Sequence, residues 1–424
     1  MSSSRFADVP VRRHAPHDET PSPEERPIRV ALLGATGSIG RQVVDVISRD
    51  RRFQVVGLAA GRNTRLFGDQ VRQLRPAIAI VAADADRTQL GELPDRTRLE
   101  VGGEALIALA GRGDLDLLIV ATGGMISLRP VLAALGAGTP VATANKETLV
   151  AGGHLVMPVA RELAAARAIE RPGDPLASPL GWLRPIDSEH SAIWQCLVGE
   201  APSAVAGLIL TASGGPFLDL PTASLASVTP AQALRHPTWS MGAKITIDSA
   251  TLANKGLEIV EAHWLYDAGY DAIEVVIHPQ SVVHSAVRFV DGSVKAQLGT
   301  PDMRLPIQYA LTYPERRPSP TPAPDLVEIG RLDFRAPDEV RFPALRIARD
   351  AGRLGPWATG ALIAADEVAV ARFLDGTLDF PGIPRLLERA VERYGARSGA
   401  APAVDDLIAL DAEIRALWSS GTVG

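Results

Sequence analysis

The sequence predicts an α/β protein with three parts: a doubly wound parallel sheet, then an α+β domain, then a C-terminal α-helical bundle. A buried apolar segment, 28–33, runs directly into a glycine-rich turn and an amphipathic helix. Strands and helices then alternate to about residue 143, as in parallel sheets with helices on both faces. Beyond about residue 331, apolar residues recur at helical spacing.

The region 28–184 is expected to form a Rossmann-like, dinucleotide-binding domain. Its apolar segments are short, are bounded by turn residues and are separated by connections of helix length. This pattern is typical of buried parallel strands joined by helices. The expected strands are 28–33, 53–59, 78–81, 117–120 and 141–143.

The region 185–313 is expected to form a central α+β catalytic domain. An apolar strand, 205–211, precedes a polar segment, a short β-branched segment at 245–247 and a helix from about 252 to 266. Later segments alternate at period two, and Asp291-Gly292 supplies a tight hairpin turn. The alternating segments are 273–277, 281–290 and 293–298.

A Pro-rich linker, 314–330, precedes the C-terminal helical domain, 331–424. Four segments in that domain carry apolar residues at helical spacing, which predicts a small bundle. These segments are 343–352, 357–373, 383–394 and 404–418.

Composition excludes several classes of function. A net charge of −6 argues against nucleic-acid binding, which requires a basic surface. Cys196 is the single cysteine, so no disulfide framework or thiolate metal site is expected. No apolar run reaches the roughly 18 residues of a membrane span. Residues 1–27 are Pro-rich and polar without an apolar centre, so we expect a disordered tail on a cytoplasmic protein.

The first strand is followed by the turn Gly34-x-x-Gly37-x-x-Gly40 at the start of a helix. This arrangement lets the backbone approach a pyrophosphate at the helix N-terminus, although tight strand–helix turns also use glycine for packing. The second strand ends at 60–63, Ala-Gly-Arg-Asn, without the acid that binds an NAD ribose. Arg62 can instead pair with a 2′-phosphate, which favours NADPH over NADH. The alternative is that Arg62 is a solvated surface charge.

Three carboxylates form a candidate metal site. Asp187 and Glu189 lie at the start of an apolar helical segment, where acids also suit the helix dipole without any metal. Glu258 shares a polar stripe with Asn254 and Glu261, at i, i+4 and i+7 of one helix, which a solvated face would resemble. Oxygen ligands without cysteine suit Mg²⁺ or Mn²⁺ rather than zinc.

A candidate phosphate site follows the strand 205–211. The turn Ser213-Gly-Gly215 offers a hydroxyl group and backbone N–H groups, though an ordinary glycine-rich turn has the same composition. Ser249, Asn254 and Lys255 add further donors and a cation. The chain has only four lysines, and Lys146 and Lys255 both lie in polar runs where a compact ammonium group is useful. No glycine lies two residues before Ser213, so it does not form a hydrolase nucleophile turn.

Six motifs, in order along the chain, resemble those of the 1-deoxy-D-xylulose 5-phosphate reductoisomerase family. The resemblance implies a homodimer of V-shaped subunits that uses NADPH and a divalent metal in non-mevalonate isoprenoid synthesis. Its substrate, 1-deoxy-D-xylulose 5-phosphate, would undergo retro-aldol cleavage and re-addition and then hydride reduction to 2-C-methyl-D-erythritol 4-phosphate. The motifs are GATGSIG at 34–40, ANKE at 144–147, DSEH at 187–190, SGGPF at 213–217, HPTWSMG at 236–242 and DSATLANKGLE at 248–258.

The resemblance also assigns roles to individual residues. Cofactor contacts would be made by Thr36, Gly37, Ser38, Ile39, Gly61, Arg62, Asn63, Asn145, Glu147 and Gly242. The metal ligands would be Asp187, Glu189 and Glu258. Substrate contacts would be made by Lys146, Ser188, Glu189, Ser213, His236, Trp239 on a mobile flap, Ser249, Asn254, Lys255 and Glu258. Catalytic groups would be Lys146, Glu189, Glu258, His190, His236 and His284, although packing alone would explain His190 and His284.

Two departures from the family pattern are Ala212, in place of a glycine, and an insertion at about 168–181 that we expect to be a loop. Two rival functions share only parts of the pattern. A semialdehyde dehydrogenase-like reductase would keep the first domain without needing the three acids together. A non-catalytic NADP-binding regulator would have no use for the phosphate site.

Overall fold

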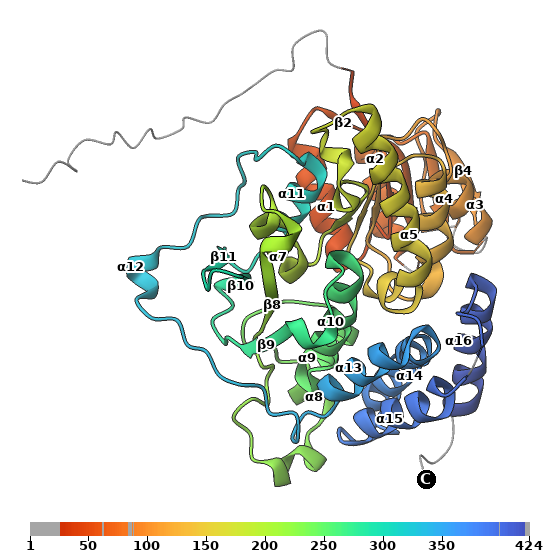
Figure 1. The fold of residues 1–424 in the computed structure, drawn as a ribbon. Helices are drawn as coiled ribbons and strands as arrows, with labels where there is room; N and C mark the ends of the chain where they lie inside the picture. The colour runs from red at the N-terminus through yellow and green to blue at the C-terminus, as the bar shows by residue number, and fades with distance from the viewer. Residues whose placement is uncertain (1–25, 62, 84–86, 88, 398, 420–424) are drawn as a thin grey trace, which may run out of the picture.

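The computed structural model describes residues 26–61, 63–83, 87, 89–397 and 399–419 (Figure 1). Arg62 and nearly all of the expected N-terminal tail lie outside the described residues. Within the described part of the chain, every helix is too short or too polar to cross a bilayer.

The N-terminal domain is built on a seven-stranded parallel sheet, which confirms the predicted fold class. Its strand order is β4-β3-β2-β1-β5-β6-β7, so the winding direction reverses between β1 and β5. Ligands of doubly wound sheets bind at the carboxyl ends of the strands beside such a reversal. The strands are β1 (Ile28–Leu33), β2 (Phe53–Ala60), β3 (Ile78–Val81), β4 (Arg98–Val101), β5 (Leu117–Val120), β6 (Val141–Thr143) and β7 (Leu183–Pro185).

Helices connect these strands, and their buried faces complete the core of the sheet (Figure 1). The expected loop at 168–181 is more ordered than its composition suggests. It begins inside a long helix, and a 3₁₀ turn (Pro175–Ala177) and a short helix, α6 (Pro179–Trp182), follow. The connecting helices are α1 (Ser38–Arg49), α2 (Thr64–Leu74), α3 (Gly103–Ala110), α4 (Leu128–Gly136) and α5 (Lys146–Glu170).

The central domain contains a four-stranded mixed sheet of order β11-β10-β8-β9. Strand β10 pairs antiparallel with β8 and β11, whereas β8 and β9 are parallel. The β-branched segment 245–247 is helical, because its side chains belong to the buried face of α9 and packing overrides local propensity. The elements are β8 (Val205–Ala212), β9 (Ile273–Ile277), β10 (Val283–Phe289), β11 (Val294–Leu298), α7 (Ser188–Leu197), α8 (Pro230–Ala233), α9 (Ala243–Thr251) and α10 (Ala253–Tyr266).

The chain then runs through α11 (Arg304–Thr312) into an extended segment that carries the single short helix α12 (Leu326–Ile329). This segment runs away from the body of the molecule before it returns (Figure 1). The four predicted C-terminal helices follow, and they share a core with the central domain. They are α13 (Ala344–Leu354), α14 (Pro356–Leu374), α15 (Gly382–Gly395) and α16 (Val404–Trp418).

Candidate active site

One cleft, with an empty volume of about 950 Å³, joins the first two domains. Its wall is formed by the first turns of α1, the starts of α5 and α7, the turn after β8, the loop before α9, and the α9–α10 junction. Residues predicted for the cofactor, the metal and the substrate therefore line the same space. The predicted residues in its lining are Ser38, Ile39, Lys146, Asp187, Ser188, Glu189, Ser213, His236, Trp239, Gly242, Ser249, Asn254, Lys255 and Glu258.

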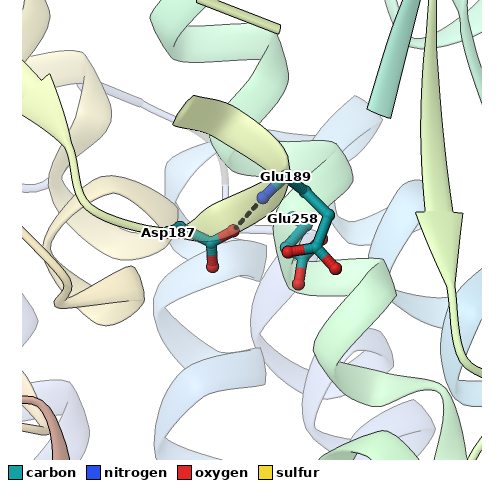
Figure 2. Close-up of side chains that lie close together, drawn as sticks. All are labelled: Asp187, Glu189 and Glu258. Atoms are coloured by element: carbon teal, nitrogen blue, oxygen red, sulfur yellow. Dashed lines mark hydrogen bonds between the residues drawn. The ribbon is translucent and has the colours of Figure 1, made fainter. Parts of the chain in front are cut away.

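Asp187, Glu189 and Glu258 converge in this cleft, although Glu258 comes from a different helix (Figure 2). One carboxylate oxygen from each lies within 4.8 Å of the others. Asp187 is the N-cap of α7, and its Oδ1 accepts a hydrogen bond of 3.2 Å from the backbone N–H of Glu189. The cap places both acids on the side of the helix start that faces α10. A helix N-terminus alone would explain Asp187 and Glu189. The carboxylate of Glu258, which lies beside them, is not explained in this way.

Two ammonium groups compensate these carboxylates. Nζ of Lys146 forms an ion pair with Asp187 and lies 3.2 Å from Oε1 of Glu258. Nζ of Lys255 lies 2.8 Å from Oε1 of Glu189 and also pairs with Glu258. Burial alone would lower the pKa of both lysines, but the carboxylates outweigh burial and raise it, well above the usual value for Lys146.

The charge of the cluster suits a divalent cation. Glu261 adds a fourth carboxylate, which is buried, with Oε2 3.5 Å from Nζ of Lys146. Four carboxylates facing two ammonium groups leave two negative charges in a largely buried site. Burial, followed by the Glu258 carboxylate, raises the pKa of Glu189. Oxygen donors with this charge suit Mg²⁺ or Mn²⁺.

His190 lies behind the cleft rather than in its lining. The ring is fully buried, with Nε2 3.3 Å from Oε2 of Glu261. Burial opposes protonation, but the carboxylates of Glu261 and Asp187 outweigh it and raise the pKa of His190. His284 on β10 is also buried outside the lining, and burial lowers its pKa. Its ring centroid is 6.1 Å from that of Trp239.

A second group in the cleft combines one imidazole with two hydroxyl groups. Nε2 of His236 lies 2.9 Å from Oγ of Ser213 and 3.1 Å from Oγ of Ser249. Nδ1 accepts hydrogen bonds from the backbone N–H groups of Thr238 and Trp239, at 3.1 and 2.9 Å. Nδ1 therefore carries no proton, and Nε2 donates to one of the two serines. Burial lowers the pKa of His236, which keeps this neutral form. The serine hydroxyl groups can then turn toward an anion.

The turn after β8 lies directly against α9. Gly215 has φ +69°, and a Cβ at this position would be 2.8 Å from the backbone oxygen of Ser249. Glycine therefore lets the Ser213 turn contact the helix that carries Ser249. Asn254 and Lys255 follow one turn later on α10, where Nδ2 of Asn254 donates to Oε1 of Glu258 at 2.5 Å. Both side chains thus contact the carboxylate cluster rather than the serine pair.

The turn after β1 has the geometry of a phosphate-binding turn. Gly34 has φ +90°, and a Cβ there would be 2.5 Å from the backbone oxygen of Ala121. A Cβ at Gly40 would be 2.1 Å from the backbone oxygen of Gly34. No side chain caps α1 at Gly37, and the first N–H groups of a helix have no partner within it. These groups, near Ser38, are available to an anion.

The remaining predicted cofactor residues lie around this turn or further out. Asn145 caps α5, accepting from the N–H of Thr148 at 2.7 Å, and holds Gly124 through a 2.9 Å bond to its backbone oxygen. Asn63 caps α2. The cleft lining as described does not include the following predicted residues: Thr36, Gly37, Gly61, Asn63, Asn145, Glu147, His190 and His284.

Some residues of the site were not singled out from the sequence. Gln42 on α1 and Met303 before α11 line the cleft, but neither belongs to a recognisable motif. Glu261 lay on the predicted polar stripe of α10 without an assigned role, and the i+7 spacing was the available signal.

The fold and the cleft together define a dinucleotide-dependent oxidoreductase with a divalent-metal site and an anion-binding group. Three family profiles match the chain: 1-deoxy-D-xylulose 5-phosphate reductoisomerase over residues 30–153, its C-terminal domain over 183–266, and the DXP reductoisomerase C-terminal domain over 298–417. The chain belongs to the 1-deoxy-D-xylulose 5-phosphate reductoisomerase family.

Individual relatives are similar to this chain over almost its whole length. The reductoisomerase of Pelotomaculum thermopropionicum is 48% identical over 386 residues, covering 90% of this chain and 95% of the relative. That of Thermosynechococcus vestitus is 45% identical, covering 92% and 91%. The Zymomonas mobilis enzyme in complex with NADPH gives a TM-score of 0.81 at 37% identity, covering 93% and 98%. A DOX-P reductoisomerase with NADPH, fosmidomycin and magnesium gives 0.82 at 35% identity, covering 92% and 97%.

Proposed function

We propose that the protein converts 1-deoxy-D-xylulose 5-phosphate into 2-C-methyl-D-erythritol 4-phosphate, using NADPH and Mg²⁺ or Mn²⁺. The observation that carries this proposal is one cleft that is lined by the start of α1, directly after the nucleotide turn, by the three converging carboxylates and by the serine–imidazole group. Carbon-skeleton rearrangement and reduction by one enzyme require these three elements within reach of one substrate. Neither rival function uses all of them.

Asp187, Glu189 and Glu258 would hold the metal ion through one oxygen each. When bound, the divalent ion would act as a Lewis acid on the ketose oxygens, and NADPH would supply the hydride. Lys146 pairs with the carboxylates of Asp187 and Glu258 and so fixes their orientation. Its pKa is raised, so it acts as a permanent cation and as a hydrogen-bond donor.

Ser213, Ser249 and His236 would bind the substrate phosphate. The neutral imidazole takes up one acceptor position of a serine and leaves the hydroxyl protons free to donate. Asn254 and Lys255 line the same cleft beside this group and contact the carboxylates, Asn254 that of Glu258 and Lys255 those of Glu189 and Glu258. A phosphate held here supplies binding energy remote from the reacting carbons.

His190 and His284 would act as positioning residues. His190 contacts Glu261, which in turn lies beside Lys146. His284 lies against Trp239, which lines the cleft from the loop before α9. Closure of that loop would exclude water from the reacting substrate.

The test is NADPH oxidation with 1-deoxy-D-xylulose 5-phosphate as substrate. We expect turnover with Mg²⁺ or Mn²⁺, none after treatment with a chelator, and recovery when the metal is restored. Full activity after metal removal would refute the proposal, and so would NADPH binding without turnover in the presence of metal.

We further propose that two copies of the chain form a homodimer in the cytoplasm. Strand β11 is an edge strand, and Val294 on it is 53% exposed. The extended segment around α12 carries four more exposed apolar side chains: Leu326, Val327, Phe334 and Val340. An open sheet edge and exposed apolar side chains suit contact with a second copy. Light scattering should give twice the chain mass, and Val327→Asp should shift it toward the monomer; a monomeric wild type would refute this.

A further inference from the structure

A second ionic cluster lies where α5, α9 and α14 meet; its two aspartates are buried, whereas its lysine side chain is 32% exposed. We call it the Lys244 cluster; it consists of Lys244 and Asp248 on α9, Asp366 on α14 and Glu147 on α5. Nζ of Lys244 lies 2.6 Å from Oδ2 of Asp366 and 2.8 Å from Oδ2 of Asp248. Oε1 of Glu147 is 3.8 Å away. The side chains of Asp248 and Asp366 are only 2% and 1% exposed.

The Lys244 cluster lies directly behind the wall of the cleft. None of its four members lines the cleft, but their neighbours in sequence do. Gly242 and Ile245 flank Lys244, and Ser249 follows Asp248. Helix α9 therefore presents one side to the substrate cleft and holds the cluster on another. Any shift of α9 would move Ser249 relative to His236, which lies in the loop before it.

Lys244 contacts one aspartate on its own helix and one on a helix of the C-terminal bundle. Lys244 and Asp248 are four residues apart on the same helix, so their pairing stays within α9. The Lys244–Asp366 pair instead joins α9 to the C-terminal bundle. Among the described residues, the carboxylate of Asp366 receives no hydrogen bond of good geometry from any other donor. Burial and the Asp366 carboxylate raise the pKa of Asp248 to about 8.

We propose that the Lys244–Asp366 ion pair is a positioning contact that fixes α9 against the C-terminal bundle and so aligns Ser249 and the loop before α9 for the substrate phosphate. Its effect on catalysis presupposes the proposed function. The reasoning rests on the direction and length of the contact: of the two contacts that join α9 to a helix of another domain, the Lys244–Asp366 pair is the closer, at 2.6 Å against 3.8 Å for Lys244–Glu147. A buried charge pair is weak evidence for stability, but it can specify one arrangement of two elements.

The test variant is Asp366→Asn, which keeps the size of the side chain. Asp248 can then ionise against Lys244, so the ammonium group stays paired and the protein should fold. Because the contact to α14 is weakened, KM for 1-deoxy-D-xylulose 5-phosphate should rise about tenfold, with kcat changed by less than about twofold, the pattern of lost uniform binding. Hydrogen exchange of the α9 amides should become faster.

Two further variants separate this role from general structural damage. Glu367→Gln changes the next residue of α14, which pairs with Arg415 inside the bundle, and should leave KM and α9 exchange as in the wild type. Asp248→Asn keeps the Lys244–Asp366 pair and should raise KM less than Asp366→Asn. An unchanged KM in Asp366→Asn, or equal effects of all three variants, would overturn the inference. If the wild type itself shows no turnover, the proposed function fails, and the exchange comparison alone still decides whether α9 is anchored.

Discussion

Replacing Glu258 by glutamine should remove most of the affinity for divalent cations while leaving the fold intact. The side chain is 1% exposed and contacts Lys146, Lys255 and Asn254. Glutamine has the same shape, and its single amide oxygen can still accept from the donors on one side of the group, either Lys146 and Asn254 or Lys255. The change also removes the carboxylate repulsion that, after burial, raises the pKa of Glu189. We therefore expect the unfolding free energy of the metal-free protein to change by no more than about 1 kcal/mol.

The effect on metal binding is far larger, because one of two uncompensated negative charges is lost. A unit charge about 4 Å from another contributes about 4 kcal/mol at an effective dielectric constant of about 20. That energy corresponds to about a thousandfold loss of affinity. The double charge of the metal ion doubles this interaction energy, whereas the glutamine oxygen and water recover part of the lost energy. We therefore expect a loss of affinity of about a thousandfold.

Mn²⁺ binding followed by electron paramagnetic resonance measures the change directly, and NADPH turnover measures its consequence. The matched control is Glu261→Gln, which removes the same charge one turn further along α10 but is not one of the three converging acids. It should weaken Mn²⁺ binding by only about 10- to 100-fold. Wild-type affinity in Glu258→Gln, or equal losses in both variants, would refute the assignment of Glu258 as a metal ligand.

Three more predictions concern the nucleotide turn, the Lys244 cluster and the serine pair. Gly40→Ala should weaken NADPH binding in a fluorescence titration by at least about tenfold without affecting Mn²⁺, because its Cβ would lie 2.1 Å from a backbone oxygen; unchanged NADPH affinity would contradict the turn geometry. Folding raises the pKa of Asp248 to about 8, above the value of about 4 in unfolded chains. The native state therefore keeps a proton that the unfolded state releases. In denaturant unfolding, the unfolding free energy of the wild type should fall relative to that of Asp248→Asn as the pH rises from about 4 to about 8, and the difference should be constant above about pH 8. A difference that does not depend on pH would contradict this. Ser249→Ala should raise KM for the phosphorylated substrate about tenfold with little change in kcat, since a hydrogen bond to a charged group contributes about 1.5–3 kcal/mol; an effect on kcat alone would contradict phosphate binding.

Much of the architecture follows from local pattern. The predicted strands 28–33, 117–120 and 141–143 became β1, β5 and β6, and the four C-terminal helices lie where apolar spacing placed them. Strands β4 and β7 escaped prediction, because they are the two edge strands of the sheet: β4 is partly exposed, and β7 includes Arg184 and Pro185, which do not form an apolar run. Such elements are specified by pairing with neighbours rather than by periodicity.

The residues of the candidate site could likewise be predicted only in part from the sequence. The cap at Asp187 and the polar stripe of α10 could each be explained without a function. In the sequence, only the family motifs indicated that these acids form one metal site. The structure supplied the distance among the carboxylates, which no spacing along the chain encodes. The contact between Lys244 and Asp366 was invisible in the sequence, because its members lie on α9 and α14 and belong to no shared motif.

The distribution of the four lysines has a practical consequence for labelling this protein. Three of the lysines form ion pairs that raise their pKa values, so few of these amines are deprotonated near neutral pH. They are Lys146, Lys244 and Lys255. Lys295 lies on strand β11 with its side chain 45% exposed, where it contacts Glu200 and lies over the Phe289 ring. Of the four lysines, an amine-reactive dye should therefore attach chiefly to Lys295 in the native protein. A fluorophore there would sit on the open edge of the second sheet and report whether another molecule covers it.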